Sequence, residues 1–252
     1  MPENYPGGKT DIEQRLRKLI ARVRFAEKTY QRVPGSVQIL PVSKTRSAQS
    51  LAEVAALKLP GVGGAFSESY LQEAENKITQ LAGLNLQWHF IGPIQSNKTQ
   101  SIARLFHWVH GVDRIKIAQR LNNQRPTGLP PLNVCLQVNI SGEPSKSGVS
   151  LGALPTLAQQ VATLPNLRLR GLMAIPAASK NMAVQRAAFA AVYEAFHSLA
   201  FHSRTPGMAE PKWDTLSMGM STDLEAAIAE GATIVRIGTD IFGPRVVQDT
   251  AD

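Results

Sequence analysis

The stretch NVCLQVNISGEPSKSGVSLGALPTLAQQVATLPNLRLRGLM, residues 133–173, decides the fold of this 252-residue chain. It begins with a largely apolar run at 133–140 that is typical of a strand, followed by a polar loop at 141–149 that contains glycine and proline. A helical pattern covers 151–163, and a second apolar run covers 167–173. A strand, a crossover helix and another strand form the unit from which parallel sheets are built.

The same alternation extends to both sides of this unit. Further strands are expected at 37–43, 61–66, 86–91, 108–112, 214–218 and 233–237. Further helices are expected at about 47–57, 69–82, 97–105, 113–123, 182–200 and 222–230. Eight strands that alternate with helices predict an α/β protein with one (β/α)8 TIM barrel at about 37–245; an open doubly wound sheet is the alternative.

The helix expected at about 9–32 is an addition to the barrel. Its apolar residues fall on one face of an amphipathic helix, namely Ile12, Leu16, Leu19, Ile20 and Val23. Near the other end of the chain, Thr222 and Glu225 have the spacing of a capping box, and Gly231 is expected to end that helix. Since no stretch resembles an interdomain linker, we expect a single domain over 1–252.

The composition excludes several classes of protein. A hydrophobic share of 43% excludes intrinsic disorder, and the single cysteine, Cys135, excludes an internal disulfide framework. No apolar run approaches the roughly 18 residues of a membrane span, and the N-terminus has no signal-peptide pattern. We therefore expect a soluble, cytoplasmic protein without a membrane partner. The net charge of +8 is typical of a solvated surface, and a basic cluster at 15–24 leaves a nucleic-acid-binding module as an alternative.

One lysine lies where barrel enzymes place their chemistry, at the carboxyl end of a strand. Lys44 directly follows the strand expected at 37–43, and no acidic residue lies within eight positions on either side. A desolvated lysine there could have a lowered pKa and act as a Schiff-base nucleophile; the alternative is a solvated lysine at a strand end. Lys98 and Lys146 are rival lysines near the same face, or surface residues.

Two short loops at the same end of the barrel are candidates for a phosphate site. Ser217–Ser221 follows the seventh strand, and Arg236–Thr239 ends the eighth. The loops after these two strands frequently bind phosphate in barrels, although such glycine and serine turns are also common as plain turns. A reactive lysine beside a phosphate site suggests pyridoxal 5′-phosphate (PLP), whose aldehyde needs an amine.

These residues also resemble a known family. The motifs PVSKT (41–45), WHFIGPIQSNK (88–98), LSMGMS (216–221) and VRIGT (235–239) are similar, in this order, to those of the pyridoxal phosphate homeostasis protein family, the YggS/PROSC-like proteins. The resemblance covers about 9–245. It implies a barrel similar to the N-terminal domain of bacterial alanine racemase, with PLP as the cofactor and Lys44 as the internal aldimine lysine.

The resemblance also implies roles for other residues. Ser217, Gly238 and Thr239 would hold the phosphate, and Arg236 would lie near the pyridine nitrogen. Met218 and His89 would line the pocket. The family usually reads Phe-Gly-Glu-Asn-Tyr after the second strand, whereas this chain has FSESY at 66–70. Ser69 therefore offers a shorter polar group to the cofactor region, and Ser67 lacks the φ freedom of glycine.

Three functions remain to be compared. A non-catalytic carrier or buffer of PLP in vitamin B6 homeostasis is expected first, as a monomer with PLP-dependent apoenzymes as possible recipients. Arginine beside the ring nitrogen favours a weak electron sink, and the chain ends soon after its eighth strand, whereas alanine racemase takes its second base from a further domain. A PLP-dependent amino-acid racemase or lyase is the alternative. A nucleic-acid-binding module is the third.

Overall fold

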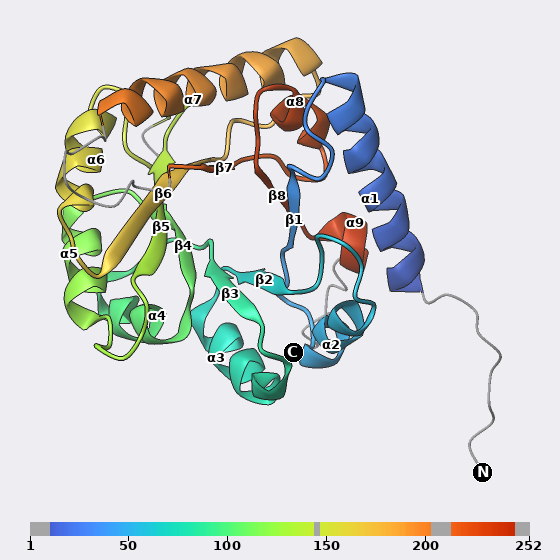
Figure 1. Ribbon diagram of the computed structural model, residues 1–252, viewed down its shortest axis with the longest axis horizontal. Coiled ribbons are helices and arrows are strands. Elements are labelled where there is room, and N and C mark those ends of the chain that lie inside the picture. The colour runs from blue at the N-terminus through green and yellow to red at the C-terminus, as the bar shows by residue number, and fades with distance from the viewer. Residues whose placement is uncertain (1–10, 144–146, 203–212, 245–252) are drawn as a thin grey trace, which may run out of the picture.

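Eight parallel strands form one sheet that curves into a barrel. The structure is a computed structural model that describes residues 11–143, 147–202 and 213–244. The strand order is β1-β8-β7-β6-β5-β4-β3-β2, and Figure 1 shows the strands arranged as a ring inside the helices. The strands are β1 (Gln38–Pro41), β2 (Ala65–Glu68), β3 (Gln87–Phe90), β4 (Trp108–Val112), β5 (Leu132–Val138), β6 (Leu167–Ala174), β7 (Thr215–Ser217) and β8 (Ile234–Ile237). The predicted TIM barrel is confirmed.

The helices cover the outside of this ring (Figure 1). They are α1 (Asp11–Thr29), α2 (Ala48–Ala56), α3 (Leu71–Gln80), α4 (Thr99–Leu105), α5 (Ile115–Gln124), α6 (Leu154–Ala162), α7 (Met182–His202), α8 (Leu224–Ala229) and α9 (Thr239–Phe242), with short 3-10 turns η1 (Ala82–Leu84) and η2 (Ser96–Lys98). The additional N-terminal helix is confirmed as α1, which packs against α8 and α9. Within the described ranges, none of the helices is long and apolar enough to cross a membrane.

The ring closes between β1 and β2 through a single parallel bridge, Val42 with Ser67. The Ser43 amide donates to the Ser67 carbonyl at 2.9 Å, and the Ser67 hydroxyl donates to the Pro41 carbonyl at 3.1 Å. Ser67 lies within β2, so its backbone is extended and does not need the φ freedom of glycine. The serine that replaces the family's usual glycine therefore contributes to the closure of the barrel.

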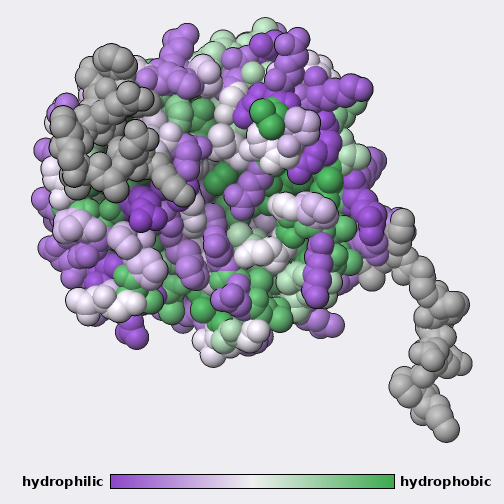
Figure 2. All heavy atoms as spheres, in the orientation of Figure 1, coloured by the Kyte–Doolittle hydropathy of each residue, from purple (hydrophilic) through white to green (hydrophobic). Residues whose placement is uncertain are grey.

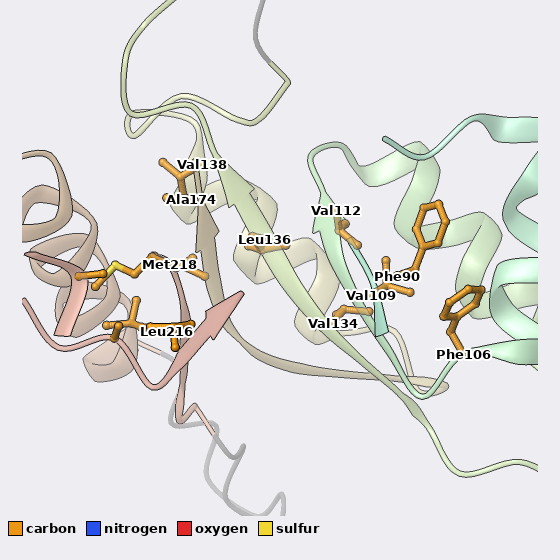
Figure 3. Close-up of a cluster of buried hydrophobic side chains, with 14 of the residues drawn as sticks. Phe90, Phe106, Val109, Val112, Val134, Leu136, Val138, Ala174, Leu216 and Met218 are labelled. Atoms are coloured by element: carbon orange, nitrogen blue, oxygen red, sulfur yellow. The ribbon is translucent and has the colours of Figure 1, made fainter. Parts of the chain in front are cut away.

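The hydrophobic core lies between the strands and the helices. Val109, Val134, Leu136 and Leu216 are all at most 2% exposed and belong to one continuous cluster. Figure 3 shows these side chains distributed over β4, β5 and β7. Outside the core, hydrophilic residues cover most of the face seen in Figure 2, with hydrophobic ones visible in the gaps.

Two local predictions were wrong. The second strand was expected at 61–66, but it begins at Ala65, because Gly61 (φ +77°) and Gly63 (φ +94°) adopt left-handed turn conformations. The capping box is not formed either. Asp223, not Thr222, precedes α8, and the carboxylate of Glu225 pairs with Arg22 of α1. Tertiary contacts with α1 therefore override the local capping signal.

The basic residues of α1 are largely neutralised by neighbouring carboxylates. Arg15 pairs with Asp11, Arg17 with Glu13, Arg24 with Glu27, and Arg22 with both Glu225 and Asp240. The four arginines of the basic cluster at 15–24 thus form ion pairs, and the two pairs of Arg22 tie α1 to α8 and α9. A nucleic-acid surface needs basic groups that are available to phosphates, and this pairing disfavours one here.

Candidate functional site

Strand register brings three of the four sequence motifs, those at 41–45, 216–221 and 235–239, together at the carboxyl ends of β1, β7 and β8. Pro41 is in register with Ile237, and the Val42 amide donates to the Ile237 carbonyl at 2.8 Å. Consequently the half-buried Lys44, two residues further along, lies in the turn next to the loop that begins at Gly238. An added Cβ on Gly238 would meet the carbonyl oxygen of Val42 at 3.4 Å, so the two segments are in close contact.

The loop after β7 is held against β8. The Arg236 amide donates to the Gly219 carbonyl at 2.9 Å. Gly219 has φ +97°, and a Cβ there would lie 2.6 Å from the Cβ of Ala227, so only glycine fits this turn. The Met220 amide donates to the carboxylate of Asp223 at 2.6 Å, which closes the loop internally. The loops at 217–221 and 236–239 are therefore neighbours, as the sequence predicts.

Four polar side chains cross the inside of the barrel in what we call the interior polar row: His89, His110, Ser217 and Arg236. Nδ1 of His89 lies 3.0 Å from Nε2 of His110, and Nδ1 of His110 lies 2.8 Å from Oγ of Ser217. Nη1 of Arg236 donates to the same Oγ at 2.9 Å. Since β4 and β7 are not neighbours in the sheet, the contact between His110 and Ser217 spans the barrel interior.

Burial controls the charge of the two histidines. All members of the row are at most 4% exposed. Desolvation lowers the pKa of His89 to about 3 and holds the pKa of His110 well below 6.5, so both rings are neutral at pH 7. Two arrangements of the ring protons then satisfy the hydrogen bonds within the row. In one, Nε2 of His89 carries a proton and can donate a hydrogen bond; in the other it carries none and can accept a hydrogen bond. This Nε2 is buried and has no partner in the described part of the chain.

Arg236 supplies the positive charge of the row. Its guanidinium donates to the carbonyl of Ser217 at 2.6 Å and to the carbonyl of Ala174 at 3.1 Å, besides the Ser217 hydroxyl. Burial lowers the pKa of Arg236 to about 10, so the group remains protonated at pH 7. It is a fixed hydrogen-bond donor inside the barrel.

The remaining predicted site residues surround this centre. Met218 is fully buried after β7 and belongs to the core cluster (Figure 3), whereas Thr239 is exposed at the start of α9. Ser69 is half-buried and lines a cavity of about 280 Å³ together with Tyr70 and Lys98. The rival Lys98 thus lines the same cavity as Ser69, while Lys146 is outside the described residues.

Sequence reasoning missed His110 as part of the site. His110 lies two residues after Trp108 in the same strand, and alternate residues of a strand share a face. The ring of Trp108 lies 5.3 Å from that of His89, in a stacked arrangement. The alternation in WVHGV could have placed Trp108 and His110 on one face, but it could not have paired His110 with Ser217, 107 residues away.

The buried histidines make the stability of the fold depend on pH. Below pH 6.5, the unfolded chain protonates His89, whereas the folded state does so only near pH 3. The free energy of unfolding is therefore expected to fall by about 1.4 kcal/mol per pH unit for this group as the pH drops through that window. Urea unfolding at pH 4.5–6.5 should show a shallower pH slope for His89→Gln than for wild type. Equal slopes would contradict this assignment.

Comparison with known proteins identifies the class of this barrel. The family model described as "Alanine racemase, N-terminal domain" matches residues 16–246. The curated pyridoxal phosphate homeostasis protein of Pseudomonas aeruginosa is 56% identical over 234 residues, which is 93% of this chain and 96% of the relative. That of Escherichia coli K12 is 47% identical over 238 residues, 93% of this chain and 97% of the relative. The chain belongs to the pyridoxal phosphate homeostasis protein family.

A solved relative has the same architecture. The structure of PipY from Synechococcus elongatus, with PLP bound, is similar with a TM-score of 0.78 and 32% sequence identity. The match covers 92% of this chain and 100% of PipY. The expected family and its barrel are therefore confirmed.

Proposed function

We propose that this protein binds PLP without catalysing a reaction and acts as an intracellular carrier or buffer in vitamin B6 homeostasis. The observation that carries the proposal is the register of β1, β8 and β7, which places the turn of Lys44 beside the loops at 217–221 and 236–239. The PLP-bound relative with the same barrel supports it. When bound, the cofactor supplies an aldehyde that condenses reversibly with a primary amine.

The residues at the barrel mouth fit this cofactor. Lys44 provides the amine. Gly238 and Thr239 stand at the start of α9, where the first amides of a helix have no partner within the helix and suit a phosphate. Arg236 provides a donor for the pyridine nitrogen. The Ser217 hydroxyl already binds His110 and Arg236, so any phosphate contact from it competes with these two groups.

His89, Met218 and Ser69 complete the proposed site as lining residues. The unpartnered Nε2 of the buried His89 is the kind of polar atom that a ligand can satisfy. Met218 contributes an apolar wall, and Ser69 contributes a hydroxyl on the side of β2.

Two features favour a carrier over an enzyme. The guanidinium of Arg236 can only donate, so it leaves the pyridine nitrogen unprotonated and the cofactor a weak electron sink. The two histidines of the row have strongly lowered pKa values, which makes them poor proton acceptors at pH 7. The alternative is a PLP-dependent racemase or lyase that acts on amino acids. We further propose a monomer that passes its cofactor to PLP-dependent apoenzymes.

One experiment separates the carrier from the enzyme. The PLP-loaded protein is incubated with a panel of amino acids in deuterium oxide, and α-deuteration is followed by NMR. A carrier leaves the α-protons at the rate given by free PLP. Incorporation at an enzyme-like rate, about 1 s⁻¹ or faster, would establish the racemase or lyase instead.

A further inference from the structure

The turn that carries Lys44 has a strained backbone. Thr45 has φ +64°, in the left-handed region that β-branched residues rarely adopt. Such a conformation persists only where the surrounding contacts determine it, and it concentrates at functional sites. The question is therefore which contacts hold residues 43–45 in place.

Ser43, on one side of Lys44, is fixed by several hydrogen bonds. Its hydroxyl donates to the carboxylate of Glu68 at 2.7 Å, and its carbonyl accepts from Nζ of Lys77 at 2.7 Å. Its amide donates to the Ser67 carbonyl. Since Ser43 is fully buried, none of these partners is readily replaced by water.

Thr45, on the other side, is fixed by a carboxylate. The Thr45 amide donates to Oε2 of Glu73 at 2.7 Å. The same carboxylate oxygen accepts from Nζ of Lys77 at 3.2 Å. A charge-assisted hydrogen bond therefore stabilises the strained residue directly after Lys44.

Lys77 joins the two sides. Its three donors reach the Ser43 carbonyl, Glu68 (2.7 Å) and Glu73, so one ammonium group links both flanks of Lys44. Lys77 is only 6% exposed and Glu68 is fully buried. An ion pair taken out of water is poor evidence for stability, because desolvation offsets the attraction; its use is more often to fix one conformation.

We propose that Lys77, with Glu68 and Glu73, is a positioning residue that holds the turn of Lys44 in the strained conformation needed to take up the aldehyde. This inference rests on the proposed role of Lys44. The cluster lies on α3 and β2 and is distinct from the phosphate loops and from the interior polar row. It acts through the backbone of residues 43 and 45.

The first test needs no cofactor. Amide hydrogen exchange of Thr45 is followed by NMR in wild type, Glu73→Ala and Lys77→Met, with Glu75→Ala on the same helix as the matched control. Loss of a charged hydrogen-bond partner is expected to speed exchange by about tenfold or more in the first two variants and not in the control. Unchanged exchange in Glu73→Ala would overturn the proposed contact.

The second test measures uptake of PLP. The rate at which borohydride-fixed phosphopyridoxyl-Lys44 appears is expected to fall at least tenfold in Lys77→Met and to recover in part in Lys77→Arg. Glu73→Ala removes the carboxylate that holds the Thr45 amide, so it is expected to slow uptake as well. Thr45→Gly keeps this amide and adopts the positive φ without strain, so it is expected to keep the wild-type rate. Wild-type rates in folded Lys77→Met and Glu73→Ala would refute the positioning role. Absence of the adduct in wild type would instead refute the proposed function. The exchange rate of the Thr45 amide would still show whether Lys77, Glu68 and Glu73 hold the turn.

Discussion

Lys44→Ala is expected to abolish covalent attachment of PLP. Wild type mixed with PLP should show a visible absorption band, and borohydride should convert it to a phosphopyridoxyl group on the peptide that contains Lys44. The variant should lose both, because alanine has no amine to condense with the aldehyde. Absorption spectra and peptide mass spectrometry measure the two effects.

The matched control is Lys98→Ala, which removes another lysine near the strand ends. Lys98 lines a cavity together with Ser69. The control therefore tests whether any nearby amine suffices for attachment of PLP. We expect the control to keep the band and the adduct on Lys44. An adduct that moves to Lys98, or that survives in Lys44→Ala, would show that the attachment site is assigned wrongly.

Arg236→Leu is expected to cause a large loss of stability. The guanidinium is the donor for the buried carbonyls of Ser217 and Ala174, and leucine leaves both acceptors without it. Each unsatisfied buried acceptor costs about 1–3 kcal/mol, so the two carbonyls predict a loss of about 2–6 kcal/mol in the free energy of unfolding. Urea unfolding of the apoprotein measures this loss, and titration with PLP should show weaker binding.

Arg17→Leu is the control for this substitution. Arg17 is 51% exposed and pairs with Glu13 one turn away, an interaction worth about 0.5 kcal/mol at most. We expect its unfolding free energy to stay close to that of wild type. A loss below about 1 kcal/mol in Arg236→Leu would mean that the row contributes little to the fold.

The sequence was sufficient for the barrel because its strands and helices alternate regularly. Lys44, Gly238 and Thr239 could be placed near one another by the same logic, since the first and last strands of a barrel are neighbours. Local signals failed where a distant partner intervenes. Glu225 has the spacing of a capping residue but pairs with Arg22, which lies 203 residues away.

The surroundings of Lys44 illustrate the same limit. Its neighbours in sequence contain no acidic residue, so the local sequence gives no sign of a carboxylate nearby. In the structure, the carboxylates of Glu68 and Glu73 contact the residues on either side of it. These glutamates follow the lysine by 24 and 29 positions, and only the pairing of β1 with β2 brings them near.

The pairing of β1 with β2 also bears on how a carrier could release PLP. β1 and β2 meet through one bridge, supported by serine hydroxyls and by the ammonium of Lys77. Opening this β1–β2 seam would break these contacts and those of Ser43 and Thr45 with Glu68 and Glu73, but not the rest of the barrel, so we expect it to cost less free energy than global unfolding. Lys44 lies at the end of the seam. The dissociation rate of the cofactor is therefore expected to follow this partial opening, and substitutions that raise the melting temperature elsewhere in the barrel should leave it unchanged.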